Sequence, residues 1–243
     1  NASLKFTGGS STPTAARGPM RTPEGVAKMT DENNDLIFYT NGSRVYAKDN
    51  SLIAQGLNGD TTQIQGVAIL PKTTCKGCQA EYYIFTMRKN AAGENQVYYS
   101  IYDRKLNGGK GGVSIKNQFL SPAPSAERFG VAVSGGDYYW LQTQDADSTI
   151  LRTFKVSKAG IGAPIESVAN SPVKGPSASS HFSRDGKVLA IAYVSPPSNQ
   201  VDIYDFDVAT GKTTFRYRIP LANSPYGVEF SADGKIVYAS TNV

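Results

Sequence analysis

The chain has 243 residues and a formal net charge of +5, and its lysines and arginines are scattered along its length. Because a nucleic-acid-binding surface needs a clustered basic stripe, this pattern argues against nucleic acid as a partner. No apolar run reaches the ~18 residues that a membrane-spanning helix requires, so we expect no membrane span. The 24 glycines and 13 prolines are typical of a domain with many turns.

Short β-type runs separated by turn residues begin near residue 20. Residues 36–40 (LIFYT) and 44–48 (RVYAK) flank the dipeptide Asn41-Gly42, a combination that predicts a β-hairpin with a tight turn. Residues 1–20 are rich in Ser, Thr, Gly and Pro, so we expect mostly loop there.

Later segments repeat this arrangement. The tripeptide Gly-Val-Ala at residues 25–27 recurs at residues 66–68 and 130–132. Further on, residues 182–187 (FSRDGK) are echoed at residues 230–235 (FSADGK). A spacing of ~40–50 residues with four short strands per unit is typical of a β-propeller blade.

The predicted fold is therefore all-β, a propeller of four-stranded antiparallel blades with almost no helix. Residues 1–243 are expected to form a partial propeller of about four and a half blades, within a ring of about seven. The approximate blades are residues 20–60, 61–120, 121–172, 173–220 and an incomplete 221–243.

Strand alternation gives specific expectations for the interior. Four glycines should occupy similar places in successive blades, namely Gly25, Gly66, Gly130 and Gly227. The predicted core residues are Ile37, Tyr39, Ile84, Val131, Leu189, Ile191, Ile203 and Val237. A slip of one residue in register would invert any of these face assignments.

The second strand of the fifth blade is expected at residues 235–240, shortly before Val243. A propeller removes exposed edges by closing its ring. We therefore expect either that the native protein continues, or that a neighbouring subunit covers this edge by strand addition.

Several segments carry a family resemblance in the same order along the chain. These are residues 36–46, 82–86, 99–103 followed by 106–109, 201–207 and 226–231. They resemble the N-terminal propeller of large secreted Bacteroidetes proteins, which often carry adhesion-type modules and a C-terminal gliding-motility or type IX secretion sorting domain. Residues 190–194, with 199–201, are more distantly similar to YVTN and lactonase-like propellers, a WD40-like repeat class.

The resemblance implies export across the outer membrane and a location outside the cell or at its surface. It also implies type IX secretion machinery as a partner, through a C-terminal domain absent from this sequence. Cys75 and Cys78 are then favoured as a small disulfide, since such bonds persist in oxidising compartments. Two free thiols are the alternative. A zinc site would need about four ligands, and a thioredoxin-type pair would need a helix N-terminus.

Compact catalytic or metal-binding constellations are not evident, so we predict no catalytic residue, metal or cofactor. His181 is the only histidine, and its equivalent in the next repeat is Glu229, which favours a packing or rim position. Asp145 and Asp147 lack the further carboxylates and glycine of a calcium loop.

Aromatic pairs offer the main candidates for binding. Tyr139 and Trp140 could stack on a surface glycan or contact a protein partner. However, tyrosine and tryptophan are also preferred strand residues, and most such rings are expected to pack between blades.

Two functions follow from these observations. The first is a non-enzymatic secreted or cell-surface scaffold that binds protein or glycan, since propellers present rigid loop-bearing faces. The alternative is a lactonase-like hydrolase with a carboxylate or metal site at the channel mouth. Its candidate residues lie beside predicted blade starts, namely Glu24, Glu127 and Glu229.

Overall fold

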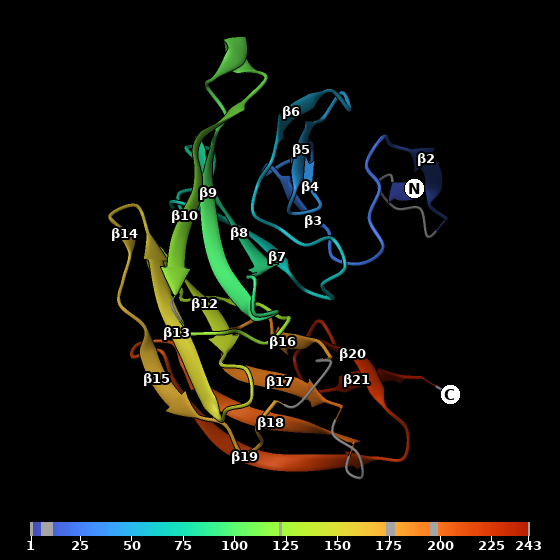
Figure 1. Cartoon of the computed structure of the whole chain (residues 1–243), viewed down its shortest axis with the longest axis vertical. Helices are drawn as coiled ribbons and strands as arrows, with labels where there is room; N and C mark the ends of the chain where they lie inside the picture. Colours follow the sequence, from blue (N-terminus) through green and yellow to red (C-terminus); the bar gives the residue numbers. More distant parts are fainter. Residues whose placement is uncertain (1, 6–11, 122, 174–177, 195–198, 243) are drawn as a thin grey trace.

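Antiparallel strands joined by short turns form the chain, which is described here from a computed structural model. The structure describes residues 2–5, 12–121, 123–173, 178–194 and 199–242. Over these residues it has β-strands and one short 3₁₀-helix, η1 (Asn107–Gly109), at the tip of a projecting hairpin (Figure 1). Within that part of the chain, no helix has the length and apolar character needed to cross a membrane.

Four sheets of four or five strands follow one another along the chain, and we call them blades 1 to 4. Blade 1 contains β3 (Ala27–Thr30), β4 (Leu36–Thr40), β5 (Arg44–Ala47) and β6 (Leu52–Gln55). Blade 2 contains β7 (Val67–Pro71), β8 (Glu81–Lys89), β9 (Asn95–Asp103) and β10 (Gly112–Ser121). Blade 3 contains β11 (Gly130–Val133), β12 (Tyr138–Gln144), β13 (Ile150–Ser157), β14 (Gly160–Ile161) and β15 (Ile165–Val168).

The C-terminal part repeats the pattern and then shortens. Blade 4 contains β16 (Ser180–Phe182), β17 (Val188–Tyr193), β18 (Asn199–Asp207) and β19 (Lys212–Leu221). Blade 5 has two described strands, β20 (Pro225–Phe230) and β21 (Val237–Thr241). A separate pair, β1 (Ala2–Lys5) and β2 (Thr14–Arg17), precedes blade 1.

The blades lie side by side along an arc, with the first strand of each on its inner side (Figure 1). Contacts between β3 and β7, between β11 and β16, and between β16 and β20 place these innermost strands next to one another. This is the arrangement of a β-propeller, so the predicted all-β propeller fold is confirmed. The size of the complete ring stays a prediction.

The turns between the first two strands of blades 4 and 5 are built alike. In blade 4 the Ser183 hydroxyl donates to the Asp185 carboxylate over 2.6 Å, and that carboxylate also accepts from the Lys187 backbone N–H. Blade 5 repeats both hydrogen bonds with Ser231, Asp233 and Lys235. The hydroxyl bond, followed by the backbone bond, lowers the pKa of both aspartates. The repeated FSxDGK pattern is therefore a repeated turn.

The four glycines predicted to be equivalent all lie at or near the start of an innermost strand. Gly25 lies two residues before β3, Gly66 immediately precedes β7, Gly130 opens β11, and Gly227 lies near the start of β20. A Cβ atom at Gly130 would lie 2.9 Å from the Phe182 ring of the neighbouring blade. Close packing between blades explains the need for glycine there.

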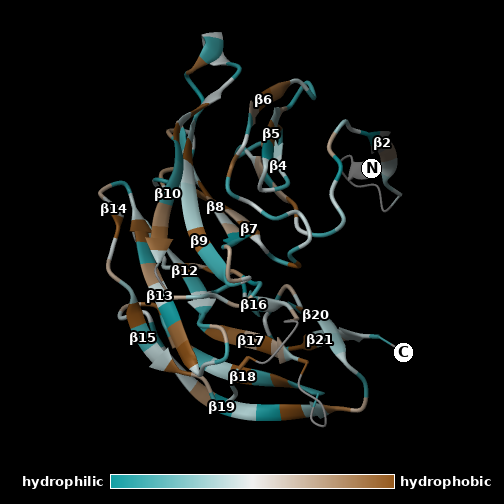
Figure 2. Cartoon of the chain, in the orientation of Figure 1, coloured by the Kyte–Doolittle hydropathy of each residue, from teal (hydrophilic) through white to brown (hydrophobic). Residues whose placement is uncertain are grey.

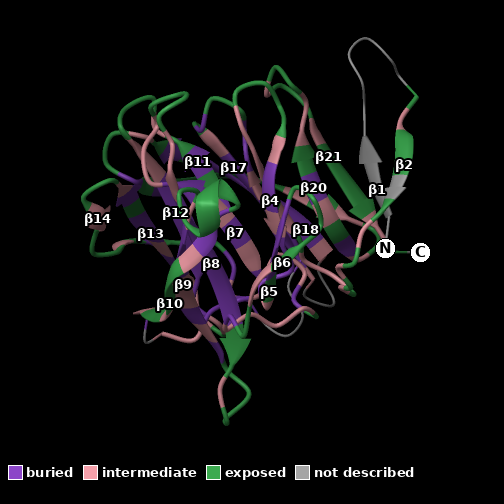
Figure 3. Cartoon of the chain, turned by 90° about the horizontal axis from the view of Figure 1, so that it is seen from above, coloured by how far each residue is buried: buried purple, intermediate pink, exposed green. Residues whose placement is uncertain are grey.

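Hydrophobic clusters fill the junctions between successive blades. Between blades 3 and 4, for example, Trp140 of β12 makes an edge-on contact with Phe206 of β18. Figure 2 shows apolar residues alternating with polar ones along β19, and Figure 3 shows buried segments along the central strands of the blades. Each blade therefore buries both faces of its sheet against the neighbouring blades, except where a blade lacks a neighbour on one side.

Most predicted core residues are buried, namely Ile37, Ile84, Leu189, Ile191 and Ile203. Tyr39 and Val237 are half-buried. Val131 was assigned to the wrong face, because it is 36% exposed while Ala132 beside it is 2% exposed. Alternation along β11 turns Ala132 toward the core and leaves Val131 on the channel side.

Two buried charges stabilise blades 3 and 4. The Arg128 guanidinium is buried and donates to the carbonyl oxygens of Ala178 and Ala192 and to Oε1 of Gln144. It also lies over the Tyr193 ring, 4.9 Å from its centroid. Such a cation is tolerated only because its donors have partners.

Asp202 on β18 is the second buried charge, with a fully buried carboxylate. Nε of Arg218 on β19 donates to it over 2.8 Å, and the Ser171 hydroxyl donates over 2.9 Å. Because Asp202, Asp205 and Asp207 alternate with apolar residues along one strand, the sequence alone predicts solvent-facing or turn-capping carboxylates at these positions. Asp207 does cap a turn through Ala209, whereas Asp202 is a core residue.

Candidate functional site

The innermost strands of blades 1 to 4 enclose a cleft of about 350 Å³ at the centre of the arc. Four of its side chains are polar, namely Lys28, Gln65, Ser180 and His181. The remaining walls are Gly25, Val26, Ala27, Ile64, Val67, Ala68, Ile69, Phe129, Val131 and Phe182. The cleft therefore combines apolar walls with a few polar groups, which is typical of small-molecule sites.

Backbone polar groups also reach this cleft, because each innermost strand is an edge of its sheet. β16 pairs with β17 on one side only. An unpaired strand edge presents free N–H and C=O groups. At Ser180 both are taken by the Gln65 side chain, whose Oε1 accepts from Ser180 N over 2.8 Å and whose Nε2 donates to Ser180 O over 3.3 Å.

His181 follows Ser180 on β16 and contributes its imidazole to the cleft wall. Its Nδ1 lies 3.1 Å from the carboxylate of Glu229 on β20 of the next blade. A proton on Nδ1 would face this carboxylate, and in that tautomer Nε2 is the nitrogen able to accept a proton. Nε2 has no hydrogen-bond partner among the residues that the structure describes, and the side chain is 39% exposed.

Lys28 supplies the single cationic side chain in the lining of this cleft, from β3 of blade 1. It is exposed, and over the described parts of the chain its ammonium has no hydrogen-bond or ion-pair partner. An unpaired ammonium in the same cleft as an imidazole can stabilise an oxyanion or hold an anionic ligand. The cleft thus contains a possible proton acceptor and a possible anion-binding group.

The three glutamates predicted as an enzyme site have separate partners. Glu24 accepts a hydrogen bond from the Tyr226 hydroxyl, Glu127 pairs with Lys89 over 3.5 Å, and Glu229 pairs with His181. Across the described residues, no three His, Cys, Asp or Glu side chains gather closely enough to hold a metal ion. These glutamates therefore do not form a shared carboxylate–metal site, and Glu229 is the one whose carboxylate pairs with His181 of the cleft lining.

The predicted binding aromatics lie inside the protein. Trp140 is 2% exposed, and its indole Nε1 donates to the Val208 carbonyl over 3.0 Å. Tyr139 is half-buried and packs on the core between blades 2 and 3, where burial raises its pKa. Trp140 is accordingly a core residue without a face for glycan stacking, because it fills a blade junction. A protein or glycan partner stays a prediction.

Cys75 and Cys78 are joined in a disulfide in the exposed loop between β7 and β8. The Thr74 hydroxyl in this loop donates to the Asp137 carboxylate over 3.0 Å. The loop therefore contacts the corresponding turn of blade 3 and lies outside the lining of the cleft.

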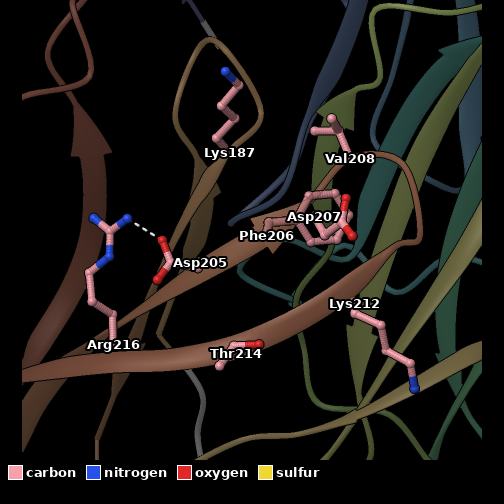
Figure 4. Close-up of a pocket in the computed structure, with 8 residues that line it drawn as sticks. All are labelled: Lys187, Asp205, Phe206, Asp207, Val208, Lys212, Thr214 and Arg216. Carbon is pink, nitrogen blue, oxygen red and sulfur yellow. Dashed lines mark hydrogen bonds and ion pairs between the residues drawn. The ribbon is translucent and has the colours of Figure 1, made fainter.

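A second hollow, of about 420 Å³, lies on blade 4 between the β17 turn and strands β18 and β19 (Figure 4). Figure 4 shows the Asp205 carboxylate turned toward the Arg216 guanidinium, with which it forms an ion pair. The Asp207 carboxylate is bound within its own turn, and Lys212 donates to the Glu166 carbonyl. Because these charges are already paired, the larger hollow is a weaker candidate than the central cleft.

Two cleft residues, Lys28 and Gln65, were not identified from the sequence. Lys28 is one of many scattered lysines, and nothing local marks it. Gln65 precedes the Gly-Val-Ala repeat directly. That position was the available signal, because the same place in blade 1 holds Glu24, one of the glutamates that had been singled out.

Neither a family model nor a curated protein matches the chain, but solved structures do. A candidate 6-phosphogluconolactonase from Bacteroides uniformis is 13% identical, with a TM-score of 0.60 over 99% of this chain and 70% of that one. A protein of unknown function from Desulfotomaculum acetoxidans is 11% identical, with a TM-score of 0.59 over 100% and 72% of the two chains. At these identities the likeness establishes the propeller fold.

A weaker match is a candidate glucose dehydrogenase from Thermus, 11% identical, with a TM-score of 0.40 over 99% of this chain and 94% of that one. The first of these neighbours is named as a candidate lactonase, which is an enzyme. The sequence-based prediction that the chain is not an enzyme is wrong on this comparison. That prediction relied on the lack of a compact constellation in the sequence, whereas the cleft is assembled from four blades.

Proposed function

We propose that the chain is a hydrolase of lactones, the cyclic esters, with the central cleft as its active site. One observation carries this proposal: His181 lines the cleft, its Nδ1 lies against Glu229, and its Nε2 has no partner among the described residues. The fold neighbour named as a candidate lactonase supports the choice of lactones among ester substrates.

In the proposed reaction, His181 acts as the general base. Nε2 takes a proton from a water molecule as its oxygen attacks the lactone carbonyl carbon, and the carbonyl becomes an oxyanion. Glu229 stabilises the imidazolium that forms, because its carboxylate faces Nδ1. A carboxylate that orients an imidazole is the same device that hydrolases on unrelated folds use.

Lys28 is proposed to stabilise the oxyanion, since its ammonium lines the same cleft. When the tetrahedral intermediate collapses, the ring C–O bond breaks and the leaving alkoxide takes the proton back from Nε2. One water is consumed, and the product is an open-chain hydroxy acid. The Lys28 ammonium is also suited to hold the carboxylate of this product or an anionic group on the substrate.

The test is ring opening of a lactone panel that includes 6-phosphogluconolactone, glucono-δ-lactone and δ-valerolactone, followed by acid release in a pH-stat. We expect hydrolysis above the spontaneous rate for at least one of them. His181→Gln should lower kcat about 100-fold or more, the usual size of a general-base contribution. Glu229→Gln should lower it less, about 10-fold, because the base remains.

Glu166→Gln is the matched control, because Glu166 is an exposed glutamate that pairs with Arg152 on the outer part of blade 3. It should leave the rate unchanged. Spontaneous rates for every lactone, or full activity in His181→Gln, would refute the proposed function.

We further propose that the chain acts outside the cytoplasm, as the resemblance to secreted type IX substrates implies. The exposed Cys75–Cys78 disulfide supports this location, because cytosolic thiols are kept reduced. Fractionation of the source cells with thiol labelling tests it. A cytosolic protein with two labelled thiols would contradict the proposal.

A further inference from the structure

We infer that Gln65 is the positioning residue for His181: its side-chain amide holds the backbone on which the imidazole is carried. The two residues belong to different blades, with Gln65 just before β7 of blade 2 and His181 on β16 of blade 4. The catalytic role of His181 in this inference rests on the proposed function. The positioning of β16 by Gln65 rests on the geometry alone.

The contact is two-pronged and specific to an amide. Oε1 of Gln65 accepts from Ser180 N over 2.8 Å, and Nε2 donates to Ser180 O over 3.3 Å. The two residues are 115 positions apart in the sequence. A primary amide is the uncharged side-chain group that offers a donor and an acceptor side by side, so it imitates the backbone of a partner strand.

The contact matters for His181 because it is made on a short edge strand. β16 has three residues and pairs with β17 alone. Ser180 is 4% exposed, so its backbone groups would be buried without partners if Gln65 were absent. A buried polar group without a partner is destabilising, and a short edge strand can relieve that cost by moving. His181 is the next residue and would move with it.

Gln65 is itself held in place, because its backbone N–H donates to the Glu127 carbonyl of the segment that leads into blade 3. The imidazole is therefore fixed from two directions. Gln65 sets the backbone of β16 from blade 2, while Glu229 sets the ring from blade 5. We expect both contacts to be needed to hold the imidazole in this position.

The histidine itself provides the readout, because the chain contains only one. A long-range ¹H–¹⁵N correlation spectrum of the 243-residue chain therefore shows the ring nitrogens of His181 alone. In Gln65→Met, which keeps the side-chain length but removes both hydrogen bonds, we expect the Nδ1 signal to shift or broaden as the contact with Glu229 loosens. In lactone hydrolysis the same variant should lower kcat about 10- to 100-fold with KM little changed, the usual effect of a small misplacement.

Gln118→Met is the matched control, since Gln118 is an exposed glutamine on β10 whose amide contacts the Lys116 carbonyl. It should leave both readouts as in the wild type. Gln65→Asn keeps the amide on a shorter stem and should also disturb the signal, so it carries the test if Gln65→Met does not fold.

An unchanged His181 spectrum in a folded Gln65 variant would overturn the inference, whatever the activity. A shifted spectrum in a protein that opens no lactone would support the positioning role while refuting the proposed function. The two failures are thus distinguishable.

Discussion

The Tyr226 hydroxyl donates a hydrogen bond to the Glu24 carboxylate, although 202 positions separate the two residues. Glu24 lies just before β3 of blade 1, and Tyr226 lies on β20 of blade 5. The pair therefore links the first and the fifth blades directly. The hydrogen bond to the carboxylate, together with burial, raises the pKa of Tyr226.

We expect this link to contribute little to stability, because Tyr226 is 39% exposed. A double-mutant cycle of Tyr226→Phe and Glu24→Gln should give a coupling of about 0.5 kcal/mol, as for other exposed polar pairs. Urea unfolding followed by circular dichroism measures it. A coupling well above that value would mean that blades 1 and 5 depend on each other more strongly than the contact indicates.

Removing the buried guanidinium of Arg128 should be far more costly. Arg128→Met leaves the carbonyl oxygens of Ala178 and Ala192 and Oε1 of Gln144 without their donor. We expect a loss of about 3 kcal/mol in the free energy of unfolding, since each buried unsatisfied acceptor costs about 1–3 kcal/mol. Arg184→Met, at an exposed turn position, is the control and should be nearly neutral. Equal stability of the two variants would contradict this prediction.

Blade 4 offers an internal comparison between a buried and an exposed ion pair on the same two strands. Asp202 pairs with Arg218 and is fully buried, whereas Asp205 pairs with Arg216 and is 52% exposed. Asp202→Ala should cost about 3–5 kcal/mol, because it strands Arg218 and nearby polar groups. Asp205→Ala should cost less than about 1 kcal/mol.

Salt separates the two cases further. The small effect of Asp205→Ala should disappear in about 1 M salt, where exposed charges are screened, while the effect of Asp202→Ala should persist. Thermal unfolding of both variants at low and high salt provides the measurement. Similar losses for both, or similar salt sensitivity, would show that burial does not set the strength of these pairs.

Alkaline pH should destabilise the protein through Tyr102. This side chain is 1% exposed and stacks on Phe38, and burial raises the pKa of its phenol to about 12. In the unfolded chain the pKa is about 10. The folded state thus keeps a proton that the unfolded state loses, so the contribution to stability is complete below pH ~10 and disappears as the pH rises toward 12.

Tyr102→Phe keeps the aromatic stack and removes the ionisable group. Urea midpoints measured from pH 8 to pH 12 should therefore fall less steeply for this variant than for the wild type above pH ~10. The two curves should run parallel below that pH, which serves as the internal control. Parallel curves over the whole range would count against Tyr102 as a source of alkaline sensitivity.

Features that depend on a few adjacent residues could be predicted from the sequence. The turn formed by Ser183 and Asp185 recurs with Ser231 and Asp233, and the repeat of FSxDGK was enough to find it. The glycines at the blade starts were found in the same way, because a glycine that close packing between blades requires, as at Gly130, is visible in the sequence itself.

Features that depend on which face of a strand is covered could not be predicted as well. Val131 and Asp202 were both placed on the wrong side. The partner of Asp202 is Arg218 on the next strand, 16 positions away, and pairing register decides whether the two meet. Alternation alone gives two faces but does not say which of them a neighbouring blade will bury.

The candidate site was predicted only in part. Glu229 was named, but in a group with Glu24 and Glu127 that the fold does not assemble. The equivalence of His181 and Glu229 in successive repeats had predicted a packing or rim position for His181. Because equivalent positions on adjacent blades lie next to each other around the channel, the same equivalence places the imidazole beside the carboxylate.

Trp140 is the only tryptophan in the chain, and it lies in the junction between blades 3 and 4. Its fluorescence therefore reports the wetting of that one junction, whereas circular dichroism averages over all sheets. Since each blade packs mainly on its neighbours, blades need not separate together. Comparing the two signals during unfolding shows whether this junction opens before, with or after the sheets as a whole. No label has to be introduced.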